Sequence, residues 1–215
     1  MNTILKYNKH IIIYFFILAI LFIITGCQPQ KGQPVGLYSN VVAVGDSLTF
    51  GYGGNGINYP TELGALIGHA VINEGKNGDT TQDVLNRIES IIENHQPSVV
   101  ILAIGGNDML RNIPDETIIS NLNKIITKVK QNAAQVILIA IPRPRATGVV
   151  FNLHDASFYK DIAKDNDIMF VENTFSNILS DKRYLSDPIH LNGDGYKEVS
   201  ELMANQINNF NVFKK

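Results

Sequence analysis

A serine directly after a strand-like apolar run is the first residue of this chain that could do chemistry. Ser47 follows VVAVG, residues 41–45, and one aspartate. A turn at this point can lift a hydroxyl off the edge of a sheet, where it could attack a carbonyl carbon. A serine at a strand end is commonly a turn or cap residue, so Ser47 needs partners to be a nucleophile. The G-x-S-x-G pattern of the α/β-hydrolase elbow is not met, because Thr49 stands where its second glycine would be.

A base for that serine lies near the C-terminus. Of the five histidines we choose His190, which has an acidic partner three residues earlier in the same loop, namely Asp187. We expect Asp187 to accept a hydrogen bond from the imidazole Nδ1 and to leave Nε2 facing Ser47. The alternative is that the pair caps the last helix, a task that Asn192 or Asp194 suits better.

Two further loops contain candidate hydrogen-bond donors. Gly78 could offer its backbone N–H, because a glycine permits close approach, and Asn107 could offer its side-chain amide after a glycine pair. In isolation both are ordinary turn residues. Together with Ser47 and His190 they supply what acyl transfer needs: a nucleophile, a base and donors aimed at an oxyanion.

The elements between these residues must bring them together. Apolar, mostly β-branched runs of strand length occur at 41–45, 70–73, 98–106, 135–142 and 167–172. Segments with helical periodicity lie between them, with apolar stripes over 84–92, 118–129 and 196–207 and a further helix beginning near Asn58 or Pro60. This order predicts a parallel sheet covered by helices on both faces, with ligands at the carboxyl ends of its strands.

The glycines after Ser47 raise a competing interpretation. Gly51, Gly53 and Gly56 satisfy the spacing of a dinucleotide-binding loop, and Glu74 lies at about the distance of a ribose-binding acid. Such a loop should begin at the strand end and lead straight into a helix, whereas further loop residues separate these glycines from their strand. We favour the hydrolase and interpret the glycines as a mobile loop beside the nucleophile.

Composition limits the number of domains and the classes of partner. The chain has 215 residues, of which 45% are hydrophobic and 18% are charged, so we expect one domain over residues 40–215. A formal net charge of −2 leaves no basic surplus for phosphates, so we expect no nucleic-acid partner. We expect a monomer.

The N-terminal residues are predicted to lie outside this domain. An apolar run from Ile11 to Ile24 is shorter than the roughly 20 residues of a bilayer-spanning helix and is typical of a secretory signal. It ends in ITGC, residues 24–27, which resembles the bacterial lipobox. That resemblance implies a lipoprotein signal peptide over 1–26 and lipidation of Cys27, while a plain signal peptide or a membrane anchor is the alternative.

The lipobox has consequences for localisation. Cys27 is the only cysteine, so an intramolecular disulfide is excluded, and residues 27–39 are polar and rich in Gly, Pro and Gln, as in a tether. We expect a protein anchored to a membrane of the bacterial cell envelope through Cys27, facing the periplasm or the exterior.

Four short blocks resemble those of the GDSL, or SGNH, hydrolase family. They are Gly45-Asp46-Ser47-Leu48, Asn73 to Gly78 with Asp79-Thr80, Gly105-Gly106-Asn107-Asp108, and Asp187-Pro188-Ile189-His190. The resemblance covers Asn40 to about Phe210 and is closest to the small bacterial esterases of the thioesterase I and lysophospholipase L1 type. It implies a three-layer α/β/α sandwich with a flavodoxin-like parallel sheet of five strands in the order 2-1-3-4-5.

The resemblance also implies roles by position. Ser47 would be the nucleophile and an oxyanion donor through its N–H, with Gly78 and Asn107 as the other donors, His190 as the base and Asp187 as its orienting acid. It implies an acyl-serine intermediate and no metal or organic cofactor.

The substrate is left open by these motifs. We expect a serine esterase acting on carboxylic esters of the lysophospholipid, lipid or aryl type. A carbohydrate O-acetyl esterase is one alternative. A non-catalytic lipoprotein that binds lipid or carbohydrate is another, although a binding module has no need for Ser47, Asp187 and His190 together.

Overall fold

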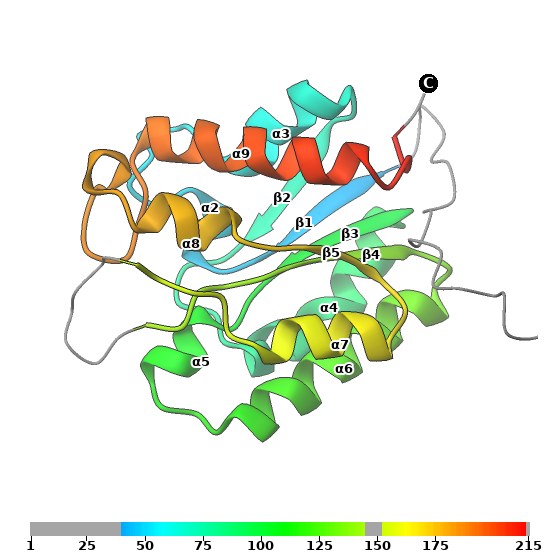
Figure 1. The fold of residues 1–215 in the computed structure, drawn as a ribbon. Coiled ribbons are helices and arrows are strands. Elements are labelled where there is room, and N and C mark those ends of the chain that lie inside the picture. The colour runs from blue at the N-terminus through cyan, green and yellow to red at the C-terminus, as the bar shows by residue number, and fades with distance from the viewer. Residues whose placement is uncertain (1–39, 145–151, 214–215) are drawn as a thin grey trace, which may run out of the picture. The chain divides into compact units, whose positions relative to one another are not determined.

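The structure, a computed structural model, describes residues 40–144 and 152–213 (Figure 1). The predicted signal peptide over 1–26, the lipid-modified Cys27 and the tether over 27–39 lie outside the described residues. In the described part, no helix is both long enough and apolar enough to cross a membrane.

Five parallel strands form one sheet in the order β2-β1-β3-β4-β5, which confirms the expected fold. The strands are β1 (Val41–Gly45), β2 (Val71–Gly75), β3 (Val99–Ala103), β4 (Gln135–Ile139) and β5 (Met169–Val171). Every residue of β1 and β3 is buried, as continuous β-branched runs indicate for strands covered on both faces.

Two strands end earlier than the apolar runs predicted. The expected strands over 98–106 and 135–142 stop at Ala103 and Ile139, because their last ladder pairs are Gly45 with Ala103 and Ile139 with Val171. Gly105, with φ 126°, then turns the chain into a helix. The residues after each strand remain buried, so hydrophobicity did not mark where the hydrogen bonds stop.

Helices cover both faces of the sheet, as Figure 1 shows. One layer contains α3 (Tyr59–Ile67), α8 (Thr174–Leu179) and α9 (Gly193–Asn208), and the other contains α4 (Thr81–His95), α6 (Asp115–Gln131) and α7 (Phe158–Asp165). The short helices α2 (Ser47–Phe50) and α5 (Gly106–Leu110) follow β1 and β3 directly, and the 3-10 turn η1 (Lys182–Tyr184) precedes α9. The predicted stripes are buried almost throughout; only Leu85 is partly exposed.

Polar side chains set where the long helices begin. Asn58 accepts a hydrogen bond from Thr61 N–H at the start of α3, and Thr80 forms a capping box with Asp83 at the start of α4. Asn192 caps α9 by accepting from Gly195 N–H at 2.9 Å. The last helix therefore has its own cap, which leaves Asp187 and His190 free for another role.

Candidate active site

Ser47 is presented by a tight turn between β1 and α2. Asp46 caps α2 by accepting from Leu48 N–H at 3.0 Å, so the helix begins with the serine itself. Gly45 permits the turn, since a Cβ there would lie 2.1 Å from Thr49 Oγ1 and 2.3 Å from Ala103 O. The buried Thr49, which takes the place of the second elbow glycine, shares a hydrogen bond of 3.1 Å with Tyr59. Asp46, Leu48 and Thr49 are buried in this turn, whereas Ser47 stays partly exposed.

The loop before α9 brings a histidine to this serine. His190 Nε2 lies 2.9 Å from Ser47 Oγ, and His190 Nδ1 lies 2.7 Å from Asp187 Oδ2. The other carboxylate oxygen of Asp187 accepts the backbone N–H groups of Ile189 and His190, each at 2.9 Å. With Nδ1 donating to Asp187, Nε2 is the ring nitrogen that can accept the proton of Ser47. The three residues expected to form a triad are thus in hydrogen-bond contact.

The Asp187 carboxylate is held in its ionised form. Burial acts to raise its pKa, but the hydrogen bonds from Ile189 and His190, together with the imidazole charge, outweigh burial and lower the pKa below its ordinary value. An ionised Asp187 fixes the orientation of the ring and stabilises the imidazolium that forms when His190 accepts a proton.

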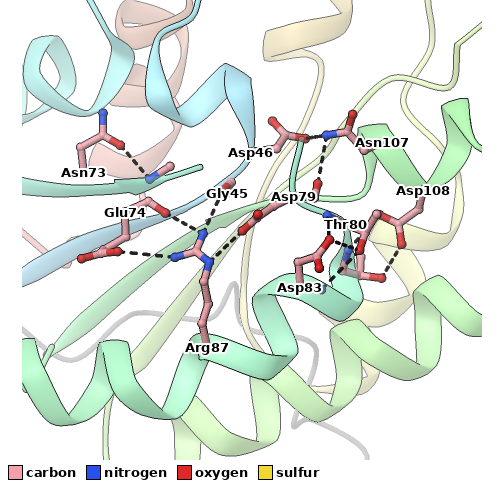
Figure 2. Close-up of polar contacts among 12 residues, drawn as sticks. Gly45, Asp46, Asn73, Glu74, Asp79, Thr80, Asp83, Arg87, Asn107 and Asp108 are labelled. Carbon is pink, nitrogen blue, oxygen red and sulfur yellow. Dashed lines mark hydrogen bonds and ion pairs between the residues drawn. The ribbon is translucent and has the colours of Figure 1, made fainter. Parts of the chain in front are cut away.

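The expected oxyanion donors lie on two neighbouring segments. Asn107, the second residue of α5, donates its amide to Asp79 O at 2.9 Å and lies 3.4 Å from Asp46 Oδ2, as Figure 2 shows. Gly78 adopts φ 82° in the loop before α4, and its carbonyl accepts from Arg111 Nη2 at 3.0 Å. Arg111 directly follows α5, so it joins the loop of Gly78 to the helix that carries Asn107.

A pocket opens beside the serine. It has a volume of about 180 Å³. Its polar end is formed by Asp46, Ser47, Asn107 and His190, and the rest of its lining is apolar apart from Gly106: Leu48, Leu110, Ile141, Pro142, Pro144, Leu153, Leu179, Pro188 and Ile189. Such a lining suits a hydrocarbon chain whose polar end reaches the serine.

The glycine loop after Ser47 packs against the histidine. Gly51, Gly53 and Gly56 have φ of 94°, 81° and 93°, a region in which other residues are strained. The loop brings the ring of Tyr52 to 4.5 Å from that of His190, and its backbone is held by Tyr196, whose hydroxyl donates to Tyr52 O at 2.8 Å. Tyr52 is a site neighbour that no sequence signal identified.

Glu74, the residue at the spacing of a ribose-binding acid, is engaged elsewhere. Its carboxylate contacts Arg87 Nη1 at 3.4 Å and His95 Nε2 at 2.7 Å. Neither part of the dinucleotide interpretation therefore holds. Glu74 is engaged by Arg87 and His95, and the short helix α2 separates the glycines from β1. Within residues 40–144 and 152–213, no group of three or more His, Cys, Asp or Glu side chains is arranged to hold a metal ion.

Comparison with known proteins decides the family. Residues 43–198 match the GDSL-like lipase/acylhydrolase family. An arylesterase of Vibrio mimicus is 27% identical over 179 residues, which cover 78% of this chain and 87% of the relative. The thioesterase 1/protease 1/lysophospholipase L1 of Escherichia coli strain K12 is 28% identical over 174 residues, covering 78% and 82% of the two chains.

A solved structure agrees with the fold. The psychrotrophic esterase EstA from Pseudoalteromonas sp., in a crystal structure inhibited by monoethylphosphonate, matches with a TM-score of 0.65 at 19% identity. The match covers 80% of this chain and 98% of that esterase. This chain belongs to the GDSL-like lipase/acylhydrolase family. The expectation of an ester hydrolase is confirmed.

This hydrolase has a buried carboxyl group directly before its serine. Burial raises the pKa of Asp46 from 3.8 to about 7, and the nearby carboxylates of Asp108 and Asp79 add to the rise, while the hydrogen bond from Leu48 N–H opposes it. In the sequence, Asp46 is distinguished only as part of the first block. Its burial, which arises from packing of the turn onto the sheet, could not be inferred there.

The shifted pKa predicts how stability depends on pH. The unfolded chain loses the Asp46 proton near pH 3.8, whereas the folded protein keeps it up to about pH 7. The contribution of this proton to stability is therefore complete below pH 3.8 and is lost as the pH rises through about 7. The free energy of unfolding of Asp46→Asn, measured by urea denaturation at about pH 5 and at about pH 8, should rise relative to that of the wild type from the lower to the higher pH. Asp181→Asn, at an exposed carboxylate whose pKa is lowered, should change stability equally at both pH values. An equal effect of Asp46→Asn at both pH values would contradict the prediction.

Proposed function

We propose that this hydrolase is a serine esterase that cleaves carboxylic esters with apolar acyl groups, of the lysophospholipid, lipid or aryl type, through an acyl-serine intermediate. The observation that carries the proposal is the contact of 2.9 Å between Ser47 Oγ and His190 Nε2 at the polar end of an apolar pocket. The names of the relatives, arylesterase and lysophospholipase, support the same substrate classes.

The geometry supports a two-step reaction. His190 Nε2 takes the proton of Ser47 as Oγ attacks the ester carbonyl carbon, and Asp187 stabilises the imidazolium through Nδ1. The oxyanion of the tetrahedral intermediate receives hydrogen bonds from the N–H groups of Ser47 and Gly78 and from the Asn107 amide. When the intermediate collapses, the bond to the alcohol oxygen breaks, and His190 gives its proton to the leaving alcohol.

The second step releases the acid. His190 takes a proton from a water molecule, whose oxygen attacks the carbonyl carbon of the acyl-serine. A second tetrahedral intermediate forms in the same donor site and collapses, the proton returns from His190 to Ser47 Oγ, and the carboxylic acid leaves. The apolar wall of the pocket holds the acyl chain through both steps.

Acyl length and the nucleophile are tested together. On a series of p-nitrophenyl esters from acetate to palmitate, we expect higher kcat/KM for chains longer than acetate, because the pocket lining is apolar. Ser47→Ala should abolish turnover and labelling by a fluorophosphonate probe, while Ser90→Ala, on the exposed side of α4, should retain both. A preference for acetate would favour the carbohydrate O-acetyl esterase. Labelling at another serine would overturn the assignment of Ser47.

The Asn107 amide separates catalysis from binding alone. The charge that it faces is absent in the ground-state ester, so its loss should affect the transition state more than substrate binding. We expect Asn107→Ala to lower kcat by roughly 10²–10³ with little change in KM. Asn94→Ala, at an exposed position of α4, is the matched control and should keep the wild-type kcat. A folded Asn107→Ala whose kcat stays within about threefold of the wild type would show that the amide is only a turn residue.

We also propose that the enzyme is anchored to a membrane of the bacterial cell envelope through a lipid on Cys27, facing the periplasm or the exterior. The support is the sequence of residues 1–39, in which an apolar run ends in ITGC and a polar stretch follows. Such an anchor would hold the catalytic domain close to lipid substrates.

Metabolic labelling tests the anchor. A palmitate analogue should label the full-length wild type and should not label Cys27→Ser, because the thiol of the only cysteine would carry the diacylglycerol. The Ser47→Ala variant, in which the anchor is intact, should be labelled like the wild type. Equal labelling of Cys27→Ser and the wild type would contradict the lipidation.

A further inference from the structure

The guanidinium group of Arg87 lies on the donor side of the active site. Arg87, on α4, donates through Nε to Asp79 Oδ2 at 2.7 Å and through Nη2 to Gly45 O at 3.2 Å and to Glu74 O at 2.9 Å, and its Nη1 contacts Glu74 Oε2 at 3.4 Å (Figure 2). Its side chain is only 20% exposed. Neither the sequence motifs nor the mechanism above assigns it a role.

The acceptors of Arg87 belong to the segments that carry the oxyanion donors. Gly45 O is the last carbonyl of β1, two residues before Ser47, and Glu74 O lies in β2 just before the loop of Gly78. The Asp79 side chain, 8% exposed, extends from that same loop. One planar cation thus joins two strand ends and the loop between β2 and α4.

Asp79 connects this cation to Asn107. Its carboxylate is held by Arg87, while its backbone carbonyl accepts one N–H of the Asn107 amide at 2.9 Å. A side-chain amide has two N–H groups, so fixing one of them on Asp79 O orients the other. The second group is then available to an oxyanion, and among the residues that the structure describes the 3.4 Å contact to Asp46 competes for it.

We propose that Arg87 is a positioning residue of the oxyanion hole, which acts through Asp79 to hold the Asn107 amide in its donating orientation. The inference rests on the proposed function, because it concerns the oxyanion of the same reaction. A lysine cannot replace this arginine, since a single ammonium group cannot reach the Asp79 carboxylate and two backbone carbonyls in the fixed fork that a guanidinium provides.

A purely structural role makes different predictions. If Arg87 only ties α4 to the sheet, its replacement lowers the melting temperature and leaves kcat per folded site unchanged. If it positions Asn107, its replacement lowers kcat, leaves KM nearly unchanged, and loses its effect once the amide is gone. Kinetics on a p-nitrophenyl ester, normalised to active sites titrated with a fluorophosphonate, distinguish the two cases.

The test is a double-mutant cycle in the full-length protein. We expect Arg87→Lys to lower kcat by about 10- to 100-fold with KM changed less than about threefold, the size of effect that a misplaced catalytic group has. In the Asn107→Ala background, Arg87→Lys should lower kcat by less than about a further threefold, because the donor that Arg87 holds is missing. Arg183→Lys, at an exposed guanidinium paired with Asp181, is the matched control and should keep the wild-type kcat.

Chemical rescue adds an independent readout. Methylguanidinium at millimolar concentration should restore part of kcat to Arg87→Ala and none to Asn107→Ala. If Arg87→Lys does not fold, Asp79→Asn decides instead, because it removes the carboxylate and keeps the carbonyl that holds Asn107. A fall in kcat that vanishes in the Asn107→Ala background supports the proposal for either variant.

Two results would overturn the proposal. One is an unchanged kcat per site in Arg87→Lys, and the other is a double variant whose fold-loss in kcat equals the product of the losses of Arg87→Lys and Asn107→Ala. Failure of the proposed function looks different, since the wild type and Arg183→Lys would then also lack esterase activity.

Discussion

The parallel pairing of β1 with β2 and β3 is the constraint on which the rest of the structure depends. Gly45 is in register with Gly75 on one side and Ala103 on the other, so three strands end at the same level. Because connections between parallel strands return the chain to the same starting edge, the segment after each strand emerges at one common edge. Ser47, Gly78 and Asn107 are far apart in sequence, and their three segments share this edge because each follows one of these strands.

Tight packing at that edge has an electrostatic cost. The turn that exposes Ser47 has no space for a Cβ at Gly45 and buries the Asp46 carboxyl group, whose pKa rises to about 7 as a result. Two more carboxylates, those of Asp79 and Asp108, lie close enough to contribute to this rise. Arg87 brings a positive charge to Asp79 in the same region. The donor side of the site thus contains several ionisable side chains with little exposure to solvent. Their arrangement is stable only when their polar atoms have hydrogen-bond partners.

The histidine reaches the serine by a different route. His190 is not on a strand end; it lies in the loop that the isolated bridge of Leu185 with Leu191 closes, just before α9. Tyr196 of α9 in turn holds the backbone of Tyr52, whose ring lies against the imidazole. The site therefore has two halves, one set by the sheet and one set by the packing of α9.

Much of the site was predictable from the sequence because local features determine it. Continuous β-branched runs and helical stripes predicted the layers, and the Ser47, Asp187 and His190 pattern predicted which side chains meet, since residue type and strand-end position are written in the chain itself. Strand ends were less well predicted: Ile104 and Ile141 stay buried after the hydrogen-bonded ladder has ended, and apolar character does not distinguish the two conditions. Only the tertiary structure revealed Arg87, Tyr52 and the state of Asp46. Burial, charge proximity and ring contact are properties of residues brought together across the sheet, and a linear sequence contains no distance between such residues.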